Sequence, residues 1–289
     1  MHLVITDSGL GGLGICAALE SALRCSGHAD AVRLTYFNAW PEEGRGYNSL
    51  PDEGVRLAWF DAALSRMSDL RPDRIVIACN TLSVLFPRTN FARQSALPVV
   101  GIIDVGVDMF DEALRADQRA SIALFGTRIT MESGAHRDRL VRRGTAADRI
   151  VQVSCHGLAA AIEKDAASAE VEHLIDQCVS EAAASVPQAG PLLAGLCCTH
   201  YGYVADRFRT RFERLSGRAV RILDPNGALV RLIARESATG ASKEAITVDV
   251  ISKVTLDGWT QAGIGRLIAP ISPVTAAALQ SYTHVPDLF

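Results

Sequence analysis

The sequence lacks long apolar runs and clusters of basic residues. No apolar stretch reaches the roughly 20 residues that a membrane-spanning helix needs. The formal net charge is −3, and Lys and Arg are scattered along the chain. Nucleic acids and anionic membranes bind clustered positive charge, so we expect neither as a partner. The pattern favours a small-molecule partner.

The beginning of the chain lacks the features of an export signal. The first residues, MHLVITDSGLGG, contain no basic segment and no long apolar core. Their few apolar residues are typical of a short strand. We therefore expect a protein that stays in the cytoplasm.

The cysteines lack the spacing of a metal site or a disulfide framework. They are odd in number, scattered, and include no CxxC pair. A disulfide scaffold and a zinc knuckle are therefore not expected, and we predict no bound metal. The seven cysteines are Cys16, Cys25, Cys79, Cys155, Cys178, Cys197 and Cys198.

Composition and periodicity predict a globular protein of the α/β class. The 289 residues are 48% hydrophobic and 21% charged, which suits two domains with cores of their own. Short runs rich in Val, Ile and Leu alternate with amphipathic segments such as residues 167–184. Such runs are typical of buried parallel strands, whose crossover helices cover both faces of a doubly wound sheet. The expected strands are residues 3–6, 32–37, 74–78, 99–102, 121–125, 150–153 and 192–196.

Polar, small or thiol residues follow four of these strands directly. In open parallel sheets, ligands bind beyond the carboxyl ends of the strands, where several loops converge. We therefore predict the functional site at these strand ends. They carry Asp7 and Ser8, Cys79 to Thr81, Gly126 and Thr127, and Cys198 to His200.

The glycine-rich segment DSGLGGLG follows the first predicted strand and is compatible with a dinucleotide-binding loop. That interpretation also needs an acidic residue at the end of the second strand, where this chain has Asn38 and Ala39. A nicotinamide enzyme is therefore weakly supported. Asp7 either caps the following helix beside Ser8 or points its side chain into a site.

Cys79 and Cys198 stand in similar frames, ACNT and CCTH, each directly after a predicted strand. A free cysteine is often only a small buried apolar residue. At a helix N-terminus beside a histidine, however, the thiolate is stabilised and the thiol can serve as a base. Adjacent strand residues point to opposite faces, so only one of Cys197 and Cys198 can face a site. The residues predicted to be structural are Cys16, Cys25, Cys155 and Cys178.

Six motifs, taken in order along the chain, carry a resemblance to one family. They are DSGLGG with Asp7 and Ser8, RGYN with Tyr47 and Asn48, ACNT with Cys79 to Thr81, FGTRITMESG with Thr127 and Thr130, GLAAAIEK with Glu163, and CCTHY with Cys198 to Tyr201. Together they resemble the aspartate/glutamate racemase superfamily. His200 makes the chain similar to the glutamate racemase branch in particular.

The resemblance implies two flavodoxin-like or Rossmann-like lobes, with the active site in the cleft between them. The first lobe would comprise residues 1–101 together with 214–289 and carry Cys79. The second would comprise residues 102–213 and carry Cys198. The segment ILDPNGAL, residues 222–229, would return the chain to the first lobe. Homodimers are common in the family, so we expect one here.

The resemblance also implies a chemistry, namely racemisation of L-glutamate to D-glutamate for peptidoglycan without a cofactor. Cys79 and Cys198 would remove and deliver the α-proton on opposite faces of the substrate, because inversion with two fixed groups needs no rotation of the substrate. Asp7 would assist Cys79, and His200 with Glu163 would assist Cys198. The residues expected to bind substrate are Ser8, Tyr47, Asn48, Asn80, Thr81, Thr127, Thr130 and Thr199.

Some positions depart from the glutamate racemase pattern, and they leave other functions open. Asn48 and Gly202 replace a glycine and a proline of the family, and the stretch after Trp259 matches no family pattern. The charged loop from Glu42 to Arg45 is either a solvated loop or a reader of a substrate carboxylate. The alternatives are an aspartate or hydantoin racemase, a single-thiol decarboxylase, and a non-catalytic carboxylate-binding protein on the same fold.

Overall fold

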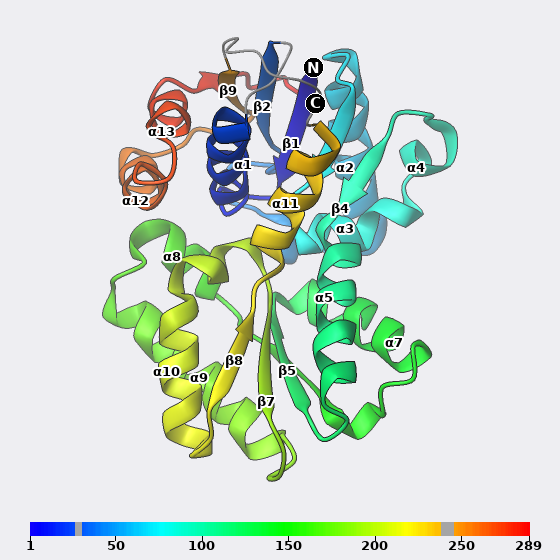
Figure 1. Ribbon diagram of the computed structural model, residues 1–289. Coiled ribbons are helices and arrows are strands. Elements are labelled where there is room, and N and C mark those ends of the chain that lie inside the picture. The colour runs from blue at the N-terminus through cyan, green and yellow to red at the C-terminus, as the bar shows by residue number, and fades with distance from the viewer. Residues whose placement is uncertain (27–30, 238–245) are drawn as a thin grey trace. The chain divides into compact units, whose positions relative to one another are not determined.

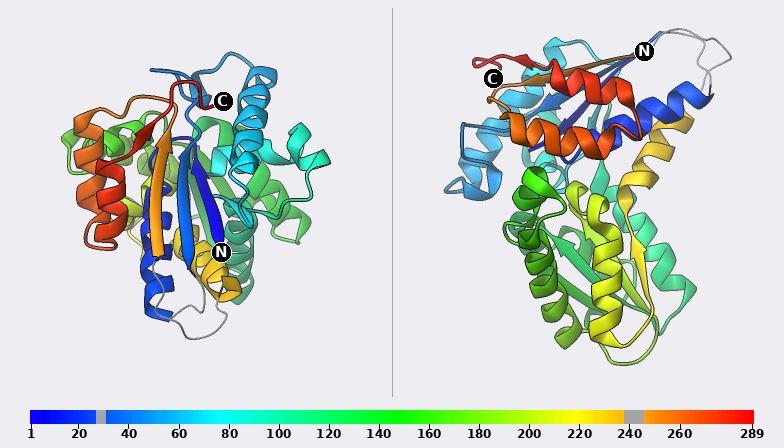
Figure 2. Two further views of the ribbon diagram at one scale, coloured as in Figure 1. Left: turned by 90° about the horizontal axis from the view of Figure 1, so that it is seen from above. Right: turned by 90° about the vertical axis from the view of Figure 1, so that its left-hand side faces the viewer.

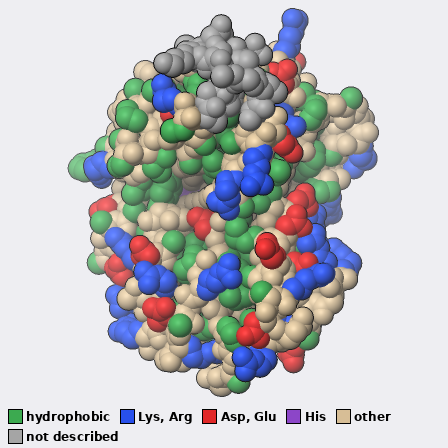
Figure 3. Space-filling view, viewed as in Figure 1, with side chains coloured by type: hydrophobic (Ala, Val, Ile, Leu, Met, Phe, Trp, Pro, Cys, Tyr) green, Lys and Arg blue, Asp and Glu red, His purple; other side chains and the backbone are tan. Residues whose placement is uncertain are grey.

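The computed structural model describes residues 1–26, 31–237 and 246–289. The chain divides into two compact units, which are described separately (Figure 1). Unit 1 comprises Met1–Ile102 and Leu229–Phe289, and unit 2 comprises Ile103–Ala228. Within the described ranges, no helix is long and apolar enough to cross a membrane. On the face in Figure 3, acidic and basic side chains lie interspersed, as the small net charge leads one to expect.

Unit 1 is built on a sheet of six parallel strands in the order β10-β9-β2-β1-β3-β4. Their bounds are β1 His2–Asp7, β2 Val32–Asn38, β3 Arg74–Ile77, β4 Val99–Gly101, β9 Ile246–Ser252 and β10 Thr283–His284. In the register of the sheet, Asp7 pairs with Asn38, and Thr6 pairs with Ile77. The carboxyl ends of β2, β1 and β3 are therefore level, which brings Asp7 and the start of the ACNT segment to one edge.

Helices cover both faces of this sheet. On one face, α1 (Leu13–Ser26) packs against α12 (Gly258–Ile268) and α13 (Pro273–Gln280), and on the other α2 (Glu53–Asp69) packs against α3 (Asn80–Leu85) and α4 (Asn90–Gln94) (Figure 2). Two short 3-10 turns, Tyr47–Ser49 and Phe86–Arg88, join the elements. The stretch after Trp259 thus belongs to unit 1, where β10 pairs with β9.

Unit 2 is built on four parallel strands in the order β6-β5-β7-β8. One face is covered by α8, α9 and α10, whose core includes Phe125, Phe208 and Phe212 with ring centroids 5.0 and 5.8 Å from Phe125. On the other face Phe110 of α5 lies so close to Gly195 of β7 that a Cβ there would come within 3.0 Å of its ring. The strands are β5 Ser121–Gly126, β6 Ile150–Ser154, β7 Leu192–Cys197 and β8 Val220–Leu223. The helices are α5 Ile102–Ala116, α6 Arg128–Glu132, α7 Ala135–Arg142, α8 Leu158–Asp165, α9 Ala169–Ser185 and α10 Ala205–Ser216. Two 3-10 turns span Ala147–Arg149 and Thr199–Val204.

The predicted α/β class with parallel sheets is confirmed, but the second lobe boundary is wrong. Residues 214–228 were expected in the first lobe, whereas the structure assigns them to unit 2. The reason is that β8 pairs with β7, with Leu192 beside Val220, and so completes the four-stranded sheet. The chain returns to unit 1 only at Leu229, within α11 (Pro225–Ser237).

Candidate functional site

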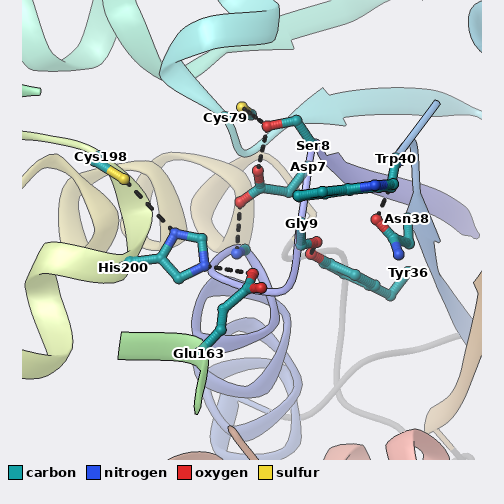
Figure 4. A network of polar contacts seen from close by, with 11 residues as sticks. Asp7, Ser8, Gly9, Tyr36, Asn38, Trp40, Cys79, Glu163, Cys198 and His200 are labelled. Carbon is teal, nitrogen blue, oxygen red and sulfur yellow. Dashed lines mark hydrogen bonds and ion pairs between the residues drawn. The ribbon is translucent and has the colours of Figure 1, made fainter. Parts of the chain in front are cut away.

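In unit 1, Cys79 lies at the junction between β3 and α3. The buried apolar strand ends at Ile77, and the side chain of Cys79 caps α3 by accepting a hydrogen bond from the Leu82 amide at 3.5 Å. The thiol is 5% exposed, and its Sγ lies 3.2 Å from the Ser8 hydroxyl (Figure 4). Ser8, which is predicted to bind substrate, thus lies directly beside this thiol.

Asp7 accepts one hydrogen bond from a backbone amide and one from a side-chain hydroxyl. Its Oδ2 accepts a hydrogen bond from the Gly12 amide at 2.6 Å, just before α1, and its Oδ1 accepts one from the Ser8 hydroxyl at 3.5 Å. A hydroxyl has one proton to donate, so with Ser8 donating to Asp7 the Cys79 thiol is the donor to Ser8. Cys79, Ser8 and Asp7 therefore form a hydrogen-bonded chain along which a proton can pass.

The glycine loop is occupied by the protein itself. A Cβ on Gly12 would lie 3.0 Å from the Asp7 carboxylate and 3.2 Å from the Ala78 carbonyl oxygen, so this position needs glycine for the close approach of β1 and β3. The Gly12 amide donates to Asp7 rather than facing an open anion site. This arrangement argues against the dinucleotide interpretation of the loop.

The surroundings of Cys79 keep it protonated. Burial raises the pKa of this thiol well above its usual value, and the negative charge of Asp7 raises it further. The hydrogen bonds that Cys79 makes with Ser8 and with the Leu82 amide lower its pKa, but they are weaker influences. Without a bound ligand Cys79 is thus a thiol, the form that delivers a proton. Cys16, predicted to be structural, is fully buried, and burial followed by the charge of Glu20 raises its pKa to about 12.

Two buried polar side chains near Cys79 are unsatisfied. The Tyr47 hydroxyl and both polar atoms of the Asn80 amide have no hydrogen-bond partner within residues 1–26, 31–237 and 246–289. Burial raises the pKa of Tyr47, and the charge of the nearby Cys79 raises it further. A buried unsatisfied group costs about 1–3 kcal/mol. Since Asn80 follows Cys79 directly, these groups are candidates for contacts with a ligand.

In unit 2, Cys198 comes directly after β7 and contacts a histidine. Its Sγ lies 3.6 Å from Nδ1 of His200, whose Nε2 lies 2.7 Å from Oε1 of Glu163 in α8 (Figure 4). The neighbouring Cys197 points its Sγ toward the Gly195 carbonyl oxygen at 3.8 Å and is fully buried. Burial, and then the charge of Cys198, raises the pKa of Cys197 well above its usual value. Only Cys198 has an acid–base partner, in agreement with strand alternation.

His200 has its charge set by its neighbours. Burial is the largest single influence and lowers the pKa of the imidazole, but the charge of Glu163 and the hydrogen bonds with Cys198 and Glu163 together outweigh it. The pKa of His200 therefore lies well above its usual value. The imidazole can hold a proton at neutral pH and exchange it with the Cys198 sulfur.

The remaining predicted residues lie in one or the other unit. In unit 2 the Thr127 and Thr130 hydroxyls are 3.0 Å apart at the start of α6, and the Thr199 carbonyl oxygen accepts a hydrogen bond from the Asn226 amide at 3.0 Å. In unit 1 Thr81 is buried in the first turn of α3, and Asn48 lies in the 3-10 turn with Tyr47.

The structure accounts for two departures from the family pattern. A Cβ on Gly202 would lie 2.6 Å from Asp224 and 2.8 Å from Asn226, so these side chains occupy the space that a proline would need. Arg45 forms an ion pair with Glu42 at 3.2 Å, and both side chains are exposed. The charged loop is thus a solvated loop, the first of its two interpretations.

A search for metal ligands gives no candidate. Among residues 1–26, 31–237 and 246–289, no group of three or more His, Cys, Asp or Glu side chains is arranged to hold an ion.

The sequence did not predict a role for Trp40, whose ring lies against the residue that precedes Tyr47. A lone tryptophan in a loop otherwise rich in charge and glycine was the signal that could have identified it.

Comparisons with known proteins agree with the motifs. The sequence profile of the Asp/Glu/Hydantoin racemase family matches residues 12–233. Glutamate racemase from Aquifex aeolicus is 31% identical over 144 residues, which cover 50% of this chain and 52% of that relative. Glutamate racemase from Granulibacter bethesdensis is 27% identical over 252 residues, which cover 84% and 81% of the two chains. The structure of glutamate racemase from Campylobacter jejuni gives a TM-score of 0.71 at 19% identity, covering 92% of this chain and 98% of the other.

These similarities differ in what they establish. The match to the Aquifex relative spans about half of that protein's length, and the structural likeness at 19% identity establishes the α/β fold. The family profile covers well over half of this chain, including Cys79, Glu163 and Cys198. The chain therefore belongs to the Asp/Glu/Hydantoin racemase family.

Proposed function

We propose that this protein racemises an acidic amino acid, converting L-glutamate to D-glutamate without a cofactor. Membership of the racemase family supports the reaction class, and similarity to proteins named glutamate racemase supports the substrate. Aspartate is the second substrate to test, because the family profile includes it.

One observation carries this proposal: each unit holds a buried thiol that is hydrogen bonded to its own acid–base partner. Cys79 contacts Asp7 through Ser8, and Cys198 contacts Glu163 through His200. A structural cysteine needs no such partner, as Cys197 illustrates. Two thiols with separate proton partners suit a reaction that removes a proton from one face of a carbon and delivers one to the other.

In the proposed mechanism the two thiols face the substrate α-carbon from opposite sides. One acts as thiolate and removes the α-proton, and the other acts as thiol and delivers a proton to the opposite face, which inverts the centre. Asp7 accepts or returns the proton of Cys79 by way of the Ser8 hydroxyl. The His200 imidazole takes the proton of the Cys198 thiol, which leaves a thiolate beside an imidazolium that Glu163 stabilises, and returns that proton when the thiolate is protonated again. Reversal of these roles gives the reverse reaction.

The unsatisfied groups near Cys79 are suited to hold the substrate. The Asn80 amide can donate to a carboxylate and accept from an ammonium group, and the Tyr47 hydroxyl can donate to a carboxylate oxygen. Donors that are fixed in advance bind a carboxylate with a smaller entropic cost of ordering. The other groups proposed to bind the substrate are Ser8, Asn48, Thr81, Thr127, Thr130 and Thr199. We propose supply of D-glutamate for peptidoglycan as the biological role.

The test is incubation of the purified protein in D₂O with L-glutamate and, separately, with L-aspartate, without added cofactor. Deuterium at the α-carbon is followed by NMR, and optical rotation by polarimetry. We expect exchange together with loss of rotation for glutamate. The same result for aspartate alone would change the substrate, and no exchange with either would reject racemisation in favour of a binding role.

Two cysteine variants and one control make this experiment specific. Cys79→Ser and Cys198→Ser should each lower racemisation by about 10³-fold, within the range for loss of a general acid or base. Each should still eliminate HCl from one enantiomer of a β-chloro acidic amino acid, since elimination needs only one base. Cys25→Ser changes an exposed thiol in unit 1 and should leave turnover unchanged. Near-normal racemisation in either catalytic variant would reject the two-thiol assignment.

A further inference from the structure

In the segment between β2 and Tyr47, Trp40 makes contacts through both its side chain and its backbone. Its indole Nε1 donates a hydrogen bond to the Glu42 carbonyl oxygen at 2.8 Å, across the turn. Its backbone amide donates to Oδ1 of Asn38 at 3.2 Å (Figure 4). The Asn38 amide in turn donates to the Ser252 hydroxyl at 3.0 Å, so Trp40 is connected to the ends of both β2 and β9.

The Trp40 ring packs directly on Gly46, the residue before Tyr47. A Cβ at position 46 would lie 2.7 and 2.9 Å from two ring carbons of the indole. The backbone of Gly46 has φ −83° and ψ 172°, a conformation that any residue adopts. Glycine is required here because the indole occupies the space of a side chain, and not because of backbone strain.

Tyr47 itself is held on two sides and unsatisfied at its end. It is 1% exposed, and its ring meets Phe60 edge to face at a centroid distance of 6.4 Å. Its hydroxyl has no hydrogen-bond partner among the described residues, and the charge that Cys79 carries as a thiolate raises the pKa of this hydroxyl. Movement of the chain at Gly46 would carry this hydroxyl away from the thiol.

We propose that Trp40 is a positioning residue, whose indole, packed on Gly46, holds the Tyr47 hydroxyl beside Cys79 to receive a substrate carboxylate. This inference rests on the proposed racemase function for the identity of the ligand. In the proposed arrangement Trp40 does not contact the reacting atoms. It acts on substrate binding through Tyr47.

The test is a double-mutant cycle on the enzyme with the substrate that the wild type racemises. Trp40→Ala should raise KM roughly tenfold with little change in kcat, as expected for loss of about one hydrogen bond to substrate. Gly46→Ala should do the same, because the new methyl group displaces the chain. The KM of the double variant should be no higher than that of Trp40→Ala alone, because the indole ring that would clash with the new methyl group is absent. Fully additive effects on KM would overturn the proposal.

Three further variants separate positioning from general destabilisation. Trp40→Phe retains the ring contact and should keep KM within about twofold of wild type. Tyr47→Phe should raise KM as Trp40→Ala does, and combining the two should add nothing. Trp259→Ala removes an exposed tryptophan of the same unit and should change neither constant. A fall in kcat at constant KM for Trp40→Ala would contradict a role through substrate binding.

An additional readout does not depend on turnover. Alkylation of Cys79 by iodoacetamide, followed by mass spectrometry, should become several-fold faster in Trp40→Ala and in Gly46→Ala, and no faster in the double variant. A wild type that racemises neither acid rejects the proposed function, and the alkylation series then decides the positioning role by itself. Unchanged alkylation in both single variants would reject that role even in an active racemase.

Discussion

The two thiols have different partners, although the proposed mechanism asks the same of both. Cys79 reaches a carboxylate through a hydroxyl, and burial together with the charge of Asp7 raises its pKa well above the usual value. Cys198 lies directly against an imidazole that Glu163 keeps protonated. The partner of Cys79 is therefore a carboxylate that can accept a proton, while the partner of Cys198 is an imidazole that already carries one.

In the proposed mechanism, this difference gives each face of the substrate its own proton partner. Removal of a proton by Cys79 would depend on Asp7 as the final acceptor, and removal by Cys198 would depend on proton transfer to His200. Each direction of turnover should therefore be sensitive to a different residue. The equilibrium constant of a racemisation is one, so the difference must appear in isotope effects and pH profiles rather than in the ratio of the two kcat/KM values.

Among changes to the groups around the two thiols, the largest loss of activity is expected when the acid–base partner of either thiol is removed. Asp7→Asn and His200→Asn should each lower racemisation by about 10²-fold, the lower end for general acid–base catalysis. Measured with α-deuterated substrates, the primary isotope effect should rise for one enantiomer in Asp7→Asn and for the other enantiomer in His200→Asn. A rise for the same enantiomer in both variants would contradict the assignment of one partner to each thiol.

A smaller effect is expected from the group behind His200. Because the charge of Glu163 raises the pKa of His200, Glu163→Gln should lower that pKa. The limb of the pH–kcat profile that follows loss of the His200 proton should then move to lower pH. Glu170→Gln, at an exposed position of α9, is the matched control and should leave the profile in place. An unmoved limb in Glu163→Gln would show that the carboxylate does not set the charge of the imidazole.

The smallest expected effect is a change of stability with pH, and it concerns His136, a second buried histidine. His136 in α7 packs against Phe110, and neither ring nitrogen has a partner among the described residues. Burial, and then the charge of Arg139, lowers its pKa to about 3. Arg139 in turn pairs with Asp104 of α5, and the charged residues next to His136 on its own helix are Arg137 and Asp138.

The sign of the resulting pH dependence follows from the two pKa values of His136. Above its unfolded pKa, near 6.5, the residue is neutral in both states, and its contribution to stability is lost progressively as the pH falls from 6.5 toward 3. Between pH 7 and pH 5 the loss should be about 2 kcal/mol. Urea unfolding of wild type and His136→Leu at both pH values measures it, and an equal loss in the variant would assign the pH dependence to other groups.

Much of the fold could be predicted because buried parallel strands have a clear local pattern. The runs ending at Asp7, before Cys79 and before Cys198 were identified in this way. The strands β8, β9 and β10 were not, because polar residues such as Arg221 and Asp249 interrupt them. Their place in the sheets depends on pairing between distant segments, which a local pattern does not contain. The wrong boundary at residue 214 has the same cause.

The candidate site could be predicted as a set of residues but not as a set of contacts. The strand-end positions indicated Asp7, Cys79 and Cys198. The hydroxyl of Ser8 between Asp7 and Cys79, the unsatisfied Tyr47 hydroxyl and the packing of Trp40 depend on side-chain geometry. These interactions join residues that are far apart along the chain, so they emerged only from the structure.

The fate of the α-proton at early times is the most direct test of two opposed thiols. L-glutamate with protium at the α-carbon is converted in D₂O, the reaction is stopped after a few per cent of turnover, and the two enantiomers are separated and weighed by mass spectrometry. Two opposed thiols predict a D-isomer that carries solvent deuterium and a remaining L-isomer that still carries protium. Protium in the D-isomer, or deuterium in both isomers from the start, would contradict two separate bases.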